Sequence, residues 1–259
     1  MFPFQNSKSV SVPRLTTILI LSLLSVSLLL LPIVNAGKKP GEFHLTITET
    51  SVTTVAEENE EAEIDLLYDS LRLEKLGLKK ETFTYAYTGY KNLVEQDVFT
   101  KEGILTICDF SQSSRKKRLY LIDLHAYKLI LQTYVAHGRN SGEEYARKFS
   151  NKPESLQSSL GFYKTRKTYF GGHGLALTLS GLEKGFNDRA EKRKIVMHGS
   201  EYVGENYLRR SKYMGRSFGC PAIPEKQATK IITAIKNGTC LFIYHPNKNY
   251  LTGSKILNG

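Results

Sequence analysis

The residues best suited to chemistry in this sequence are a cysteine and a histidine that lies 22 positions before it. Cys220 ends the segment "GRSFGC" and precedes a proline, whereas His198 ends the apolar run "IVMH" and precedes a glycine. A histidine can take the proton of a thiol, which makes the sulfur a nucleophile, and can later return that proton to a leaving amine. Gly219 lets the backbone approach closely, so the amides of Gly219 and Cys220 can face an oxyanion.

Further polar residues accompany this pair. Arg216 and Ser217 supply hydrogen-bond donors in the turn that holds Cys220. The residue types alone leave several functions open, because a cysteine peptidase or amidase uses the same pair and a basic binding module could carry Cys220 as a structural residue. Zinc bound by His198, Cys220 and His173 is another alternative, but the sequence lacks the closely spaced ligand pairs that are typical of zinc sites.

The other two cysteines have a different setting. Cys108 lies in "ILTICDF" and Cys240 in "GTCLFIY", and both are apolar segments of the kind that form buried strands. Free cysteine in such a segment behaves as a small hydrophobic residue, so we expect both in the core. A disulfide between them stays open, because the sequence does not settle connectivity.

Composition and the N-terminus limit the class of protein. The chain has 259 residues, of which 41% are hydrophobic, as expected for a globular protein. Residues 1–36 carry Lys8 and Arg14 before a long apolar run and end in "VNA". We therefore expect a signal peptide or an N-terminal membrane anchor, and in both cases export to the periplasm or cell envelope. Any contact with the membrane would be made through this segment, if it is not cleaved.

The net charge of +11 favours an anionic partner. Export makes an envelope polymer a better match than nucleic acid, which we do not expect to be bound. The basic run "RKKR" at 115–118 is short and has no interleaved aromatic residues, so we interpret it as a solvated turn before a strand.

The elements that must position the cysteine and the histidine follow from the periodicity of the chain. Residues 37–60 have no helical period, and we expect a flexible linker there. Residues 61–100 have the apolar spacing of a helical extension. Residues 101–252 predict a β-rich domain that contains one late amphipathic helix at 225–238, so the fold class is mainly β (α+β). The expected strands lie at 103–110, 117–124, 127–136, 161–170, 173–181, 192–199 and 239–245.

Several segments resemble a known family. "VMHG" followed by "GRSFGCPAIP" resembles the His and Ser-x-Gly-Cys signature of the L,D-transpeptidases, which form the YkuD-like superfamily. The resemblance to the murein L,D-transpeptidase catalytic-domain branch extends from about Leu66 to Tyr250 and includes "LTICDFSQSSRKKRLYLIDL", "VAHGRNSG", "GLEKGFND" and "CLFIYHPNKNYL". It implies a YkuD-like β-sandwich as the catalytic domain.

The resemblance also implies a role for individual residues. Cys220 matches the nucleophile, His198 the histidine that activates it, and the carbonyl of Gly199 the acceptor that orients the imidazole. Ser217 and Gly219 match the serine and glycine of the motif, and the amides of Gly219 and Cys220 match the oxyanion hole.

Two positions depart from the family pattern. Phe218 stands where the family commonly has a second histidine, and Ala222 stands where it commonly has Asn or Arg. The segment between His198 and Ser217 is also longer than usual. The roles of the missing side chains are therefore not carried over to this chain.

The activity that the resemblance implies is acyl transfer on the tetrapeptide stems of peptidoglycan. Cys220 would form a thioester with release of D-Ala and pass the acyl group to an amine, with no metal or organic cofactor. Hydrolysis of that thioester would make the protein an L,D-carboxypeptidase, and a non-catalytic cell-wall-binding module is the remaining alternative. Substrate-binding candidates in loops or near strand ends are His173, Tyr163, Arg139 and His137. The oligomeric state stays open.

Overall fold

The computed structural model describes residues 49–172 and 174–259. The expected signal peptide or anchor at 1–36 and the beginning of the expected linker lie outside the described residues. Within the described part of the chain, no helix combines the length and the apolar character needed to cross a membrane.

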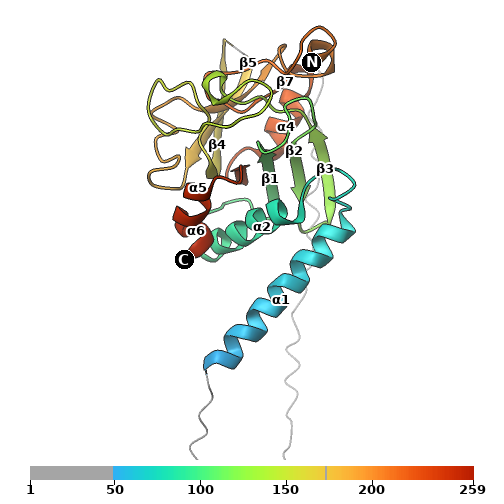
Figure 1. The fold of residues 1–259 in the computed structure, drawn as a ribbon, viewed down its shortest axis with the longest axis vertical. Helices are drawn as coiled ribbons and strands as arrows, with labels where there is room; N and C mark the ends of the chain where they lie inside the picture. The colour runs from blue at the N-terminus through green and yellow to red at the C-terminus, as the bar shows by residue number, and fades with distance from the viewer. Residues whose placement is uncertain (1–48, 173) are drawn as a thin grey trace, which may run out of the picture. The chain divides into compact units, whose positions relative to one another are not determined.

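Two helices precede the sheet (Figure 1). α1 spans Glu49–Ser70 and α2 spans Lys80–Glu95. α1 therefore begins within the segment 37–60, for which the sequence predicts a flexible linker.

The acidic residues of α1 explain this earlier start. The carboxylate of Glu60 accepts a hydrogen bond of 2.8 Å from the hydroxyl of Thr88 on α2, and Glu63 pairs with Lys91 at 3.0 Å. Glutamate is a good helix former, and the apolar residues Ile64 and Leu67 are buried next to this acidic face. The acidic run is therefore part of a packed helix and not of a linker.

Eight strands form one sheet in the order β3-β2-β1-β8-β4-β5-β6-β7. Their bounds are Ile104–Asp109 for β1, Leu119–Asp123 for β2, Lys128–Thr133 for β3, Gly161–Gly171 for β4, Gly174–Gly181 for β5, Val196–Ser200 for β6, Ala222–Pro224 for β7 and Cys240–Tyr244 for β8. Every expected strand is present, and β7 is an additional one. The pairs β1–β8 and β6–β7 are parallel, and the other five pairs are antiparallel.

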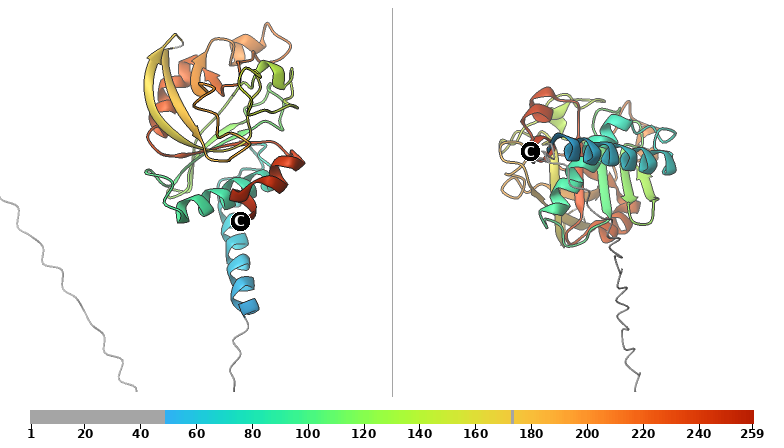
Figure 2. Two further views of the ribbon diagram at one scale, coloured as in Figure 1. Left: turned by 90° about the vertical axis from the view of Figure 1, so that its left-hand side faces the viewer. Right: turned by 90° about the horizontal axis from the view of Figure 1, so that it is seen from below.

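The sheet folds over until its two edge strands approach each other. Ala136, which follows edge strand β3, forms a β-bridge with Ala222 in the opposite edge strand β7. Figure 2 shows the strong curvature of the β4–β5 hairpin. The predicted mainly β (α+β) class is confirmed, and the β-sandwich takes the form of one folded-over sheet.

The core lies around the central strands β1, β8 and β4. The rings of Phe162 and Phe242 stack with centroids 4.2 Å apart. Gly89 lets α2 approach them, because a Cβ at this position would lie 2.1 Å from the ring of Phe162. Cys108 and Cys240 are free and fully buried, which confirms that both belong to the core.

The predicted late helix is confirmed as α4, Glu225–Ile235, which packs on β5, β6 and β7 and buries Ile231, Ile232 and Ile235. The remaining short helices are α3, Glu205–Leu208, α5, Lys248–Gly253, and α6, Lys255–Asn258, together with a 3₁₀ turn at Arg139–Ser141.

A buried carboxylate ties α5 and α6 to the sheet. Glu183 accepts hydrogen bonds from the amide of Phe162 at 2.7 Å, from the hydroxyl of Tyr250 at 3.0 Å and from the hydroxyl of Ser254. Burial raises the pKa of Glu183. The segment between β5 and β6, which leads into the strand of His198, is therefore held against the C-terminal helices.

Candidate active site

The turn that carries Cys220 is braced by a serine. The hydroxyl of Ser217 donates to the carbonyl of Cys220 at 2.6 Å and accepts from the amide of Gly219 at 3.1 Å. Gly219 has a φ of +123°, and a Cβ there would lie 2.8 Å from the carbonyl oxygen of Gln157. The turn therefore needs glycine at this position for both its conformation and its space.

One extended segment holds both ends of this turn. The amide of Ser217 donates to the carbonyl of His137 at 3.0 Å, and the amide of Arg139 donates to the carbonyl of Ser217 at 2.8 Å. Beyond the turn, the amide of Ala136 donates to the carbonyl of Ala222 at 2.8 Å. These backbone bonds set the cysteine at the start of β7.

The histidine lies on the neighbouring strand. β6 runs parallel to β7, and His198 is the register partner of Ala222, two residues after Cys220. Nδ1 of His198 lies 2.9 Å from the carbonyl oxygen of Gly199, and the imidazole is buried. A carbonyl oxygen can only accept, so Nδ1 carries the proton and Nε2 is the basic nitrogen.

The sulfur of Cys220 has two polar contacts with the backbone before β6 and at its start. The amide of Val196 donates to it at 3.5 Å, and the thiol lies 3.9 Å from the carbonyl oxygen of Lys194. Burial raises the pKa of Cys220, while the amides of Val196 and Cys220 and the charge of Arg193 act to lower it. Because burial dominates, the thiol is protonated at neutral pH and needs a base before it can attack.

Arg193 is a residue of this site that the sequence reasoning missed. Its guanidinium donates to the carbonyls of Ser150 at 2.7 Å and Gln157 at 2.5 Å, and its Nη2 lies 3.2 Å from where a Cβ of Gly219 would be. The only signal was its place in the basic run "EKRK" just before β6. Nothing in that run distinguishes the inward-facing cation from Lys192, which is exposed.

His137 lies beneath the turn and not in an open cleft. It is buried, and its Nδ1 accepts a hydrogen bond of 2.8 Å from the guanidinium of Arg118. Burial and the charge of Arg118 lower the pKa of His137 to about 3. Arg118 is itself fully buried and donates to the carbonyl of Val135, so the interpretation of "RKKR" as a solvated turn is wrong for its last residue.

The other substrate-binding candidates are distributed over different places. Tyr163 is fully buried, and its hydroxyl donates to the carbonyl of Ser159 at 2.9 Å, so it lies in the core. Arg139 is exposed, with its guanidinium 6.0 Å from the ring centroid of Phe218. Arg216 donates to the carbonyl of Gly142 at 3.1 Å. His173 lies outside the described residues.

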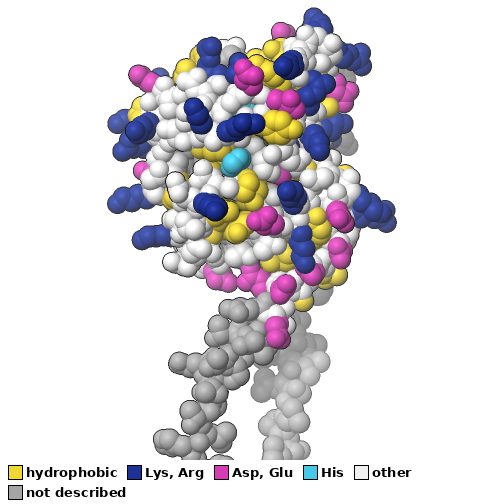
Figure 3. Space-filling view, in the orientation of Figure 1, with side chains coloured by type: hydrophobic (Ala, Val, Ile, Leu, Met, Phe, Trp, Pro, Cys, Tyr) yellow, Lys and Arg dark blue, Asp and Glu magenta, His cyan; other side chains and the backbone are white. Residues whose placement is uncertain are grey.

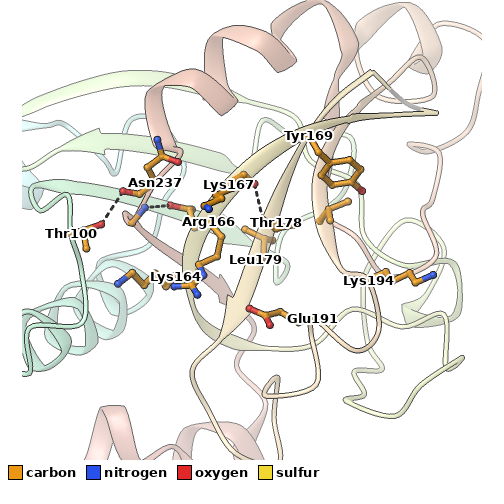
Figure 4. A pocket seen from close by; sticks show the side chains of 13 residues that line it. Thr100, Lys164, Arg166, Lys167, Tyr169, Thr178, Leu179, Glu191, Lys194 and Asn237 are labelled. Carbon is orange, nitrogen blue, oxygen red and sulfur yellow. Dashed lines mark hydrogen bonds between the residues drawn. The ribbon is translucent and has the colours of Figure 1, made fainter.

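A cleft of about 910 Å³ lies over β4 and β5, and neither Cys220 nor His198 belongs to its lining (Figure 4). Its lining includes Val196 and Lys194, whose backbone atoms contact the sulfur. The rest of the lining comes from β4, β5, the turn after α4, the segment before β6 and Thr100, which lies between α2 and β1. In Figure 3 the Lys and Arg side chains are spread widely over the face of the described domain.

Cys220 and His198 therefore lie on neighbouring segments of the sheet, and the sulfur contacts the amide of Val196, two residues before the histidine. Within residues 49–172 and 174–259, no group of three or more His, Cys, Asp or Glu side chains could hold a metal ion. The zinc site considered above depended on His173, which is not among these residues.

Solved structures with limited similarity include an L,D-transpeptidase from Mycobacterium smegmatis, at 10% identity, a TM-score of 0.35, and coverage of 55% of this chain and 59% of the other. The helical cell shape determining protein Pgp2 from Campylobacter jejuni aligns at 14% identity and a TM-score of 0.36, covering 62% of this chain and 57% of its own. The chain thus spans less than two thirds of the length of these structures.

No curated protein matches the sequence. The profile of the L,D-transpeptidase catalytic domain, in contrast, matches residues 74–244, which is well over half of the chain and includes both His198 and Cys220. This chain belongs to the L,D-transpeptidase catalytic domain family.

Proposed function

We propose that the protein is an L,D-transpeptidase that acts on peptidoglycan stem peptides through a thioester on Cys220. The parallel pairing of β6 with β7 is the observation that carries this proposal, because it sets His198 opposite Ala222, two residues beyond the cysteine. A base on one strand beside a thiol at the start of the next is the arrangement that covalent acyl transfer requires.

The first half-reaction forms the thioester. Nε2 of His198 takes the thiol proton, and the sulfur bonds to the carbonyl carbon that joins the L-centre of a diamino acid to D-Ala. The amide of Cys220, which is directed at the sulfur, can donate to the resulting oxyanion. The amide of Gly219 donates to the hydroxyl of Ser217 in this structure, and it would have to leave that hydroxyl to donate to the oxyanion. When the C–N bond breaks, the imidazolium returns the proton to the amine of D-Ala.

The second half-reaction determines the product. An amine of a second stem attacks the thioester, His198 takes a proton from that amine, and Cys220 leaves as a thiol, which yields a cross-link. Water in place of the amine yields a carboxypeptidase. We propose the cell envelope as the location, because the substrate of this reaction is the cell wall and the chain is strongly basic.

The test is mass spectrometry of the full chain and of its products after incubation with purified stem tetrapeptides. We expect a protein adduct with the mass of the tripeptide acyl group, release of D-Ala, and dimeric stems. Cys220→Ala should abolish all three, and His198→Ala should slow the first turnover about 1,000-fold. Cys108→Ala, which removes a thiol buried in the core, is the matched control and should retain activity.

The outcomes separate the alternatives. Loss of D-Ala without dimers would assign a carboxypeptidase, and peptide binding without loss of D-Ala would leave a wall-binding module. Turnover by Cys220→Ala at the wild-type rate would contradict the proposed nucleophile.

A further inference from the structure

Two basic runs that lie far apart in the sequence meet on the surface of the domain. One run is 115–117, in the turn between β1 and β2, and the other is in the segment 209–212, between α3 and β7. The guanidinium of Arg115 joins them, because it donates to the carbonyls of Lys212 at 2.6 Å and of Ser211 at 3.4 Å. We call the resulting surface the basic patch, and its exposed cations are Arg115, Lys116, Lys117, Arg209, Arg210 and Lys212.

Further contacts hold the two runs together. Nζ of Lys117 lies 3.5 Å from the carboxylate of Glu205 on α3, and Lys117 also lines one hollow of about 530 Å³ together with Arg210. The amide of Met214 donates to the hydroxyl of Ser114 at 3.4 Å. Like charges repel one another, so these contacts, and not the cations themselves, keep the two runs side by side.

The segment between β6 and β7 is packed firmly enough to carry such a surface. Val203 and Met214 are buried in a small apolar cluster with Ala136 and Ala222, separate from the main core. Ala222 lies two residues beyond Cys220, so the cluster that supports the basic patch also supports the strand of the nucleophile. A ligand on the basic patch is therefore bound by the same part of the fold that presents the cysteine.

The positive charge of the basic patch is only partly compensated. Glu205 pairs with Lys117, and Glu201 and Glu225 line the same hollow. The side chains of 209–212 form no ion pair with any residue in the described parts of the chain. Three cations thus remain available to anions from outside, and the guanidinium groups among them can bind a carboxylate through two parallel hydrogen bonds.

The place of the basic patch in the fold favours a wall polymer over a membrane. Figures 1 and 2 show the segment between β6 and β7 at the end of the domain away from α1. The N-terminal segment, for which the sequence predicts a signal peptide or an anchor, is joined to the domain through α1. A membrane tether would therefore be attached at the other end of the domain from the basic patch.

We propose that the basic patch binds carboxylates of polymeric peptidoglycan, on stem peptides other than the one that reacts with Cys220, which rests on the function proposed above. The polymer presents many stems, each with free carboxylates. A stem bound at the basic patch raises the effective concentration of its neighbours at the nucleophile. A single free stem peptide cannot occupy both places, so the basic patch favours the polymer over isolated stems.

The first test is co-sedimentation of the full chain with intact peptidoglycan, in the Cys220→Ala background to prevent chemistry. The patch variant combines Arg209→Gln, Arg210→Gln and Lys212→Gln, and it keeps the backbone carbonyls that Arg115 contacts. We expect it to bind about 10-fold more weakly at low salt, the effect of three exposed charge pairs. The control variant, which loses the same charge at exposed positions elsewhere, combines Lys152→Gln, Lys192→Gln and Lys230→Gln. It should bind within about 2-fold of the parent, and high salt should remove the difference between the two variants.

The second test measures release of D-Ala by chains that retain Cys220. The patch variant should match the control variant on the free tetrapeptide and be about 10-fold slower on intact peptidoglycan. If no chain releases D-Ala but the difference in binding persists, the catalytic proposal fails and the assignment of the basic patch stands.

Two results would overturn the assignment of the basic patch. One is equal binding of the patch and control variants to peptidoglycan, and release of D-Ala from the free peptide would then leave the catalytic proposal intact. The other is a patch variant that differs from the control only in binding to phosphatidylglycerol vesicles, which would make the basic patch a membrane contact.

Discussion

Lowering the pH from 7 to 5 should weaken the fold of the wild-type chain more than that of a His137→Asn variant. Burial and the charge of Arg118 hold the pKa of His137 at about 3 in the folded state, whereas an unfolded imidazole titrates near its ordinary value of about 6.5. Between these two values the unfolded state binds a proton that the folded state does not. The stability that depends on the neutral imidazole is therefore complete above about pH 6.5 and is lost as the pH falls.

The expected effect is a sizeable fraction of the free energy of unfolding of a typical domain. One such site changes the free energy of unfolding by up to about 1.4 kcal/mol per pH unit, and integration from pH 7 to pH 5 yields about 2 kcal/mol. The geometry agrees with a loss of stability at lower pH, because Nδ1 of His137 lies 2.8 Å from the guanidinium of Arg118, which can only donate. A proton on that nitrogen would place two donors against each other in a site that is 1% exposed.

The assay is urea unfolding at pH 7, 6 and 5. His137→Asn keeps an oxygen that can accept from Arg118 but removes the titrating group, so its stability should fall by about 2 kcal/mol less than that of the wild type over this range. His125→Asn changes an exposed histidine and should follow the wild-type curve. Parallel pH curves for the wild type and His137→Asn would refute the reasoning.

Two other changes test the turn and the sulfur. Gly219→Ala should lower the free energy of unfolding by about 1–3 kcal/mol and abolish acylation, because φ is positive there and a Cβ would lie 2.8 Å from the carbonyl oxygen of Gln157. Gly172→Ala, where a Cβ would meet no atom, is the control. An unchanged free energy of unfolding in Gly219→Ala would contradict the inferred backbone strain. Arg193→Gln should shift the pH profile of Cys220 alkylation by iodoacetamide to higher pH, because Arg193 lowers the pKa of that thiol. An unchanged profile would show that this guanidinium does not act on the sulfur, and Lys192→Gln is the matched exposed control.

The strands and the late helix could be predicted because their signal is local. The apolar runs that became β1 and β8 are buried on both faces, and the apolar face of α4 repeats at helical spacing. β7 could not be found in this way, because three residues are too few to show a period. Its existence depends on pairing with β6 and on the bridge to Ala136, and both are tertiary contacts.

The charged residues of the site were harder to predict for the same reason. Arg118 ends a run of basic residues that looks solvated, yet it is fully buried because the carbonyls of Gln112 and Val135 and the ring of His137 accept its hydrogen bonds. Arg193 likewise turns inward because the carbonyls of Ser150 and Gln157, in the long segment before β4, accept its hydrogen bonds. Acceptors of this kind belong to the folded backbone, and residue types do not reveal them.

One of the two departures from the family pattern, Ala222, has a physical reason in this fold. Ala222 is fully buried between β6 and the bridge to Ala136, so the space next to His198 has no room for the Asn or Arg that the family commonly places there. Phe218, in contrast, is 68% exposed and takes no part in bracing the turn, which depends on backbone bonds and on Ser217. Arg193, in the segment just before β6, acts to lower the pKa of the Cys220 thiol. The small residue two positions after the cysteine is thus a consequence of the contact between the two edges of the sheet.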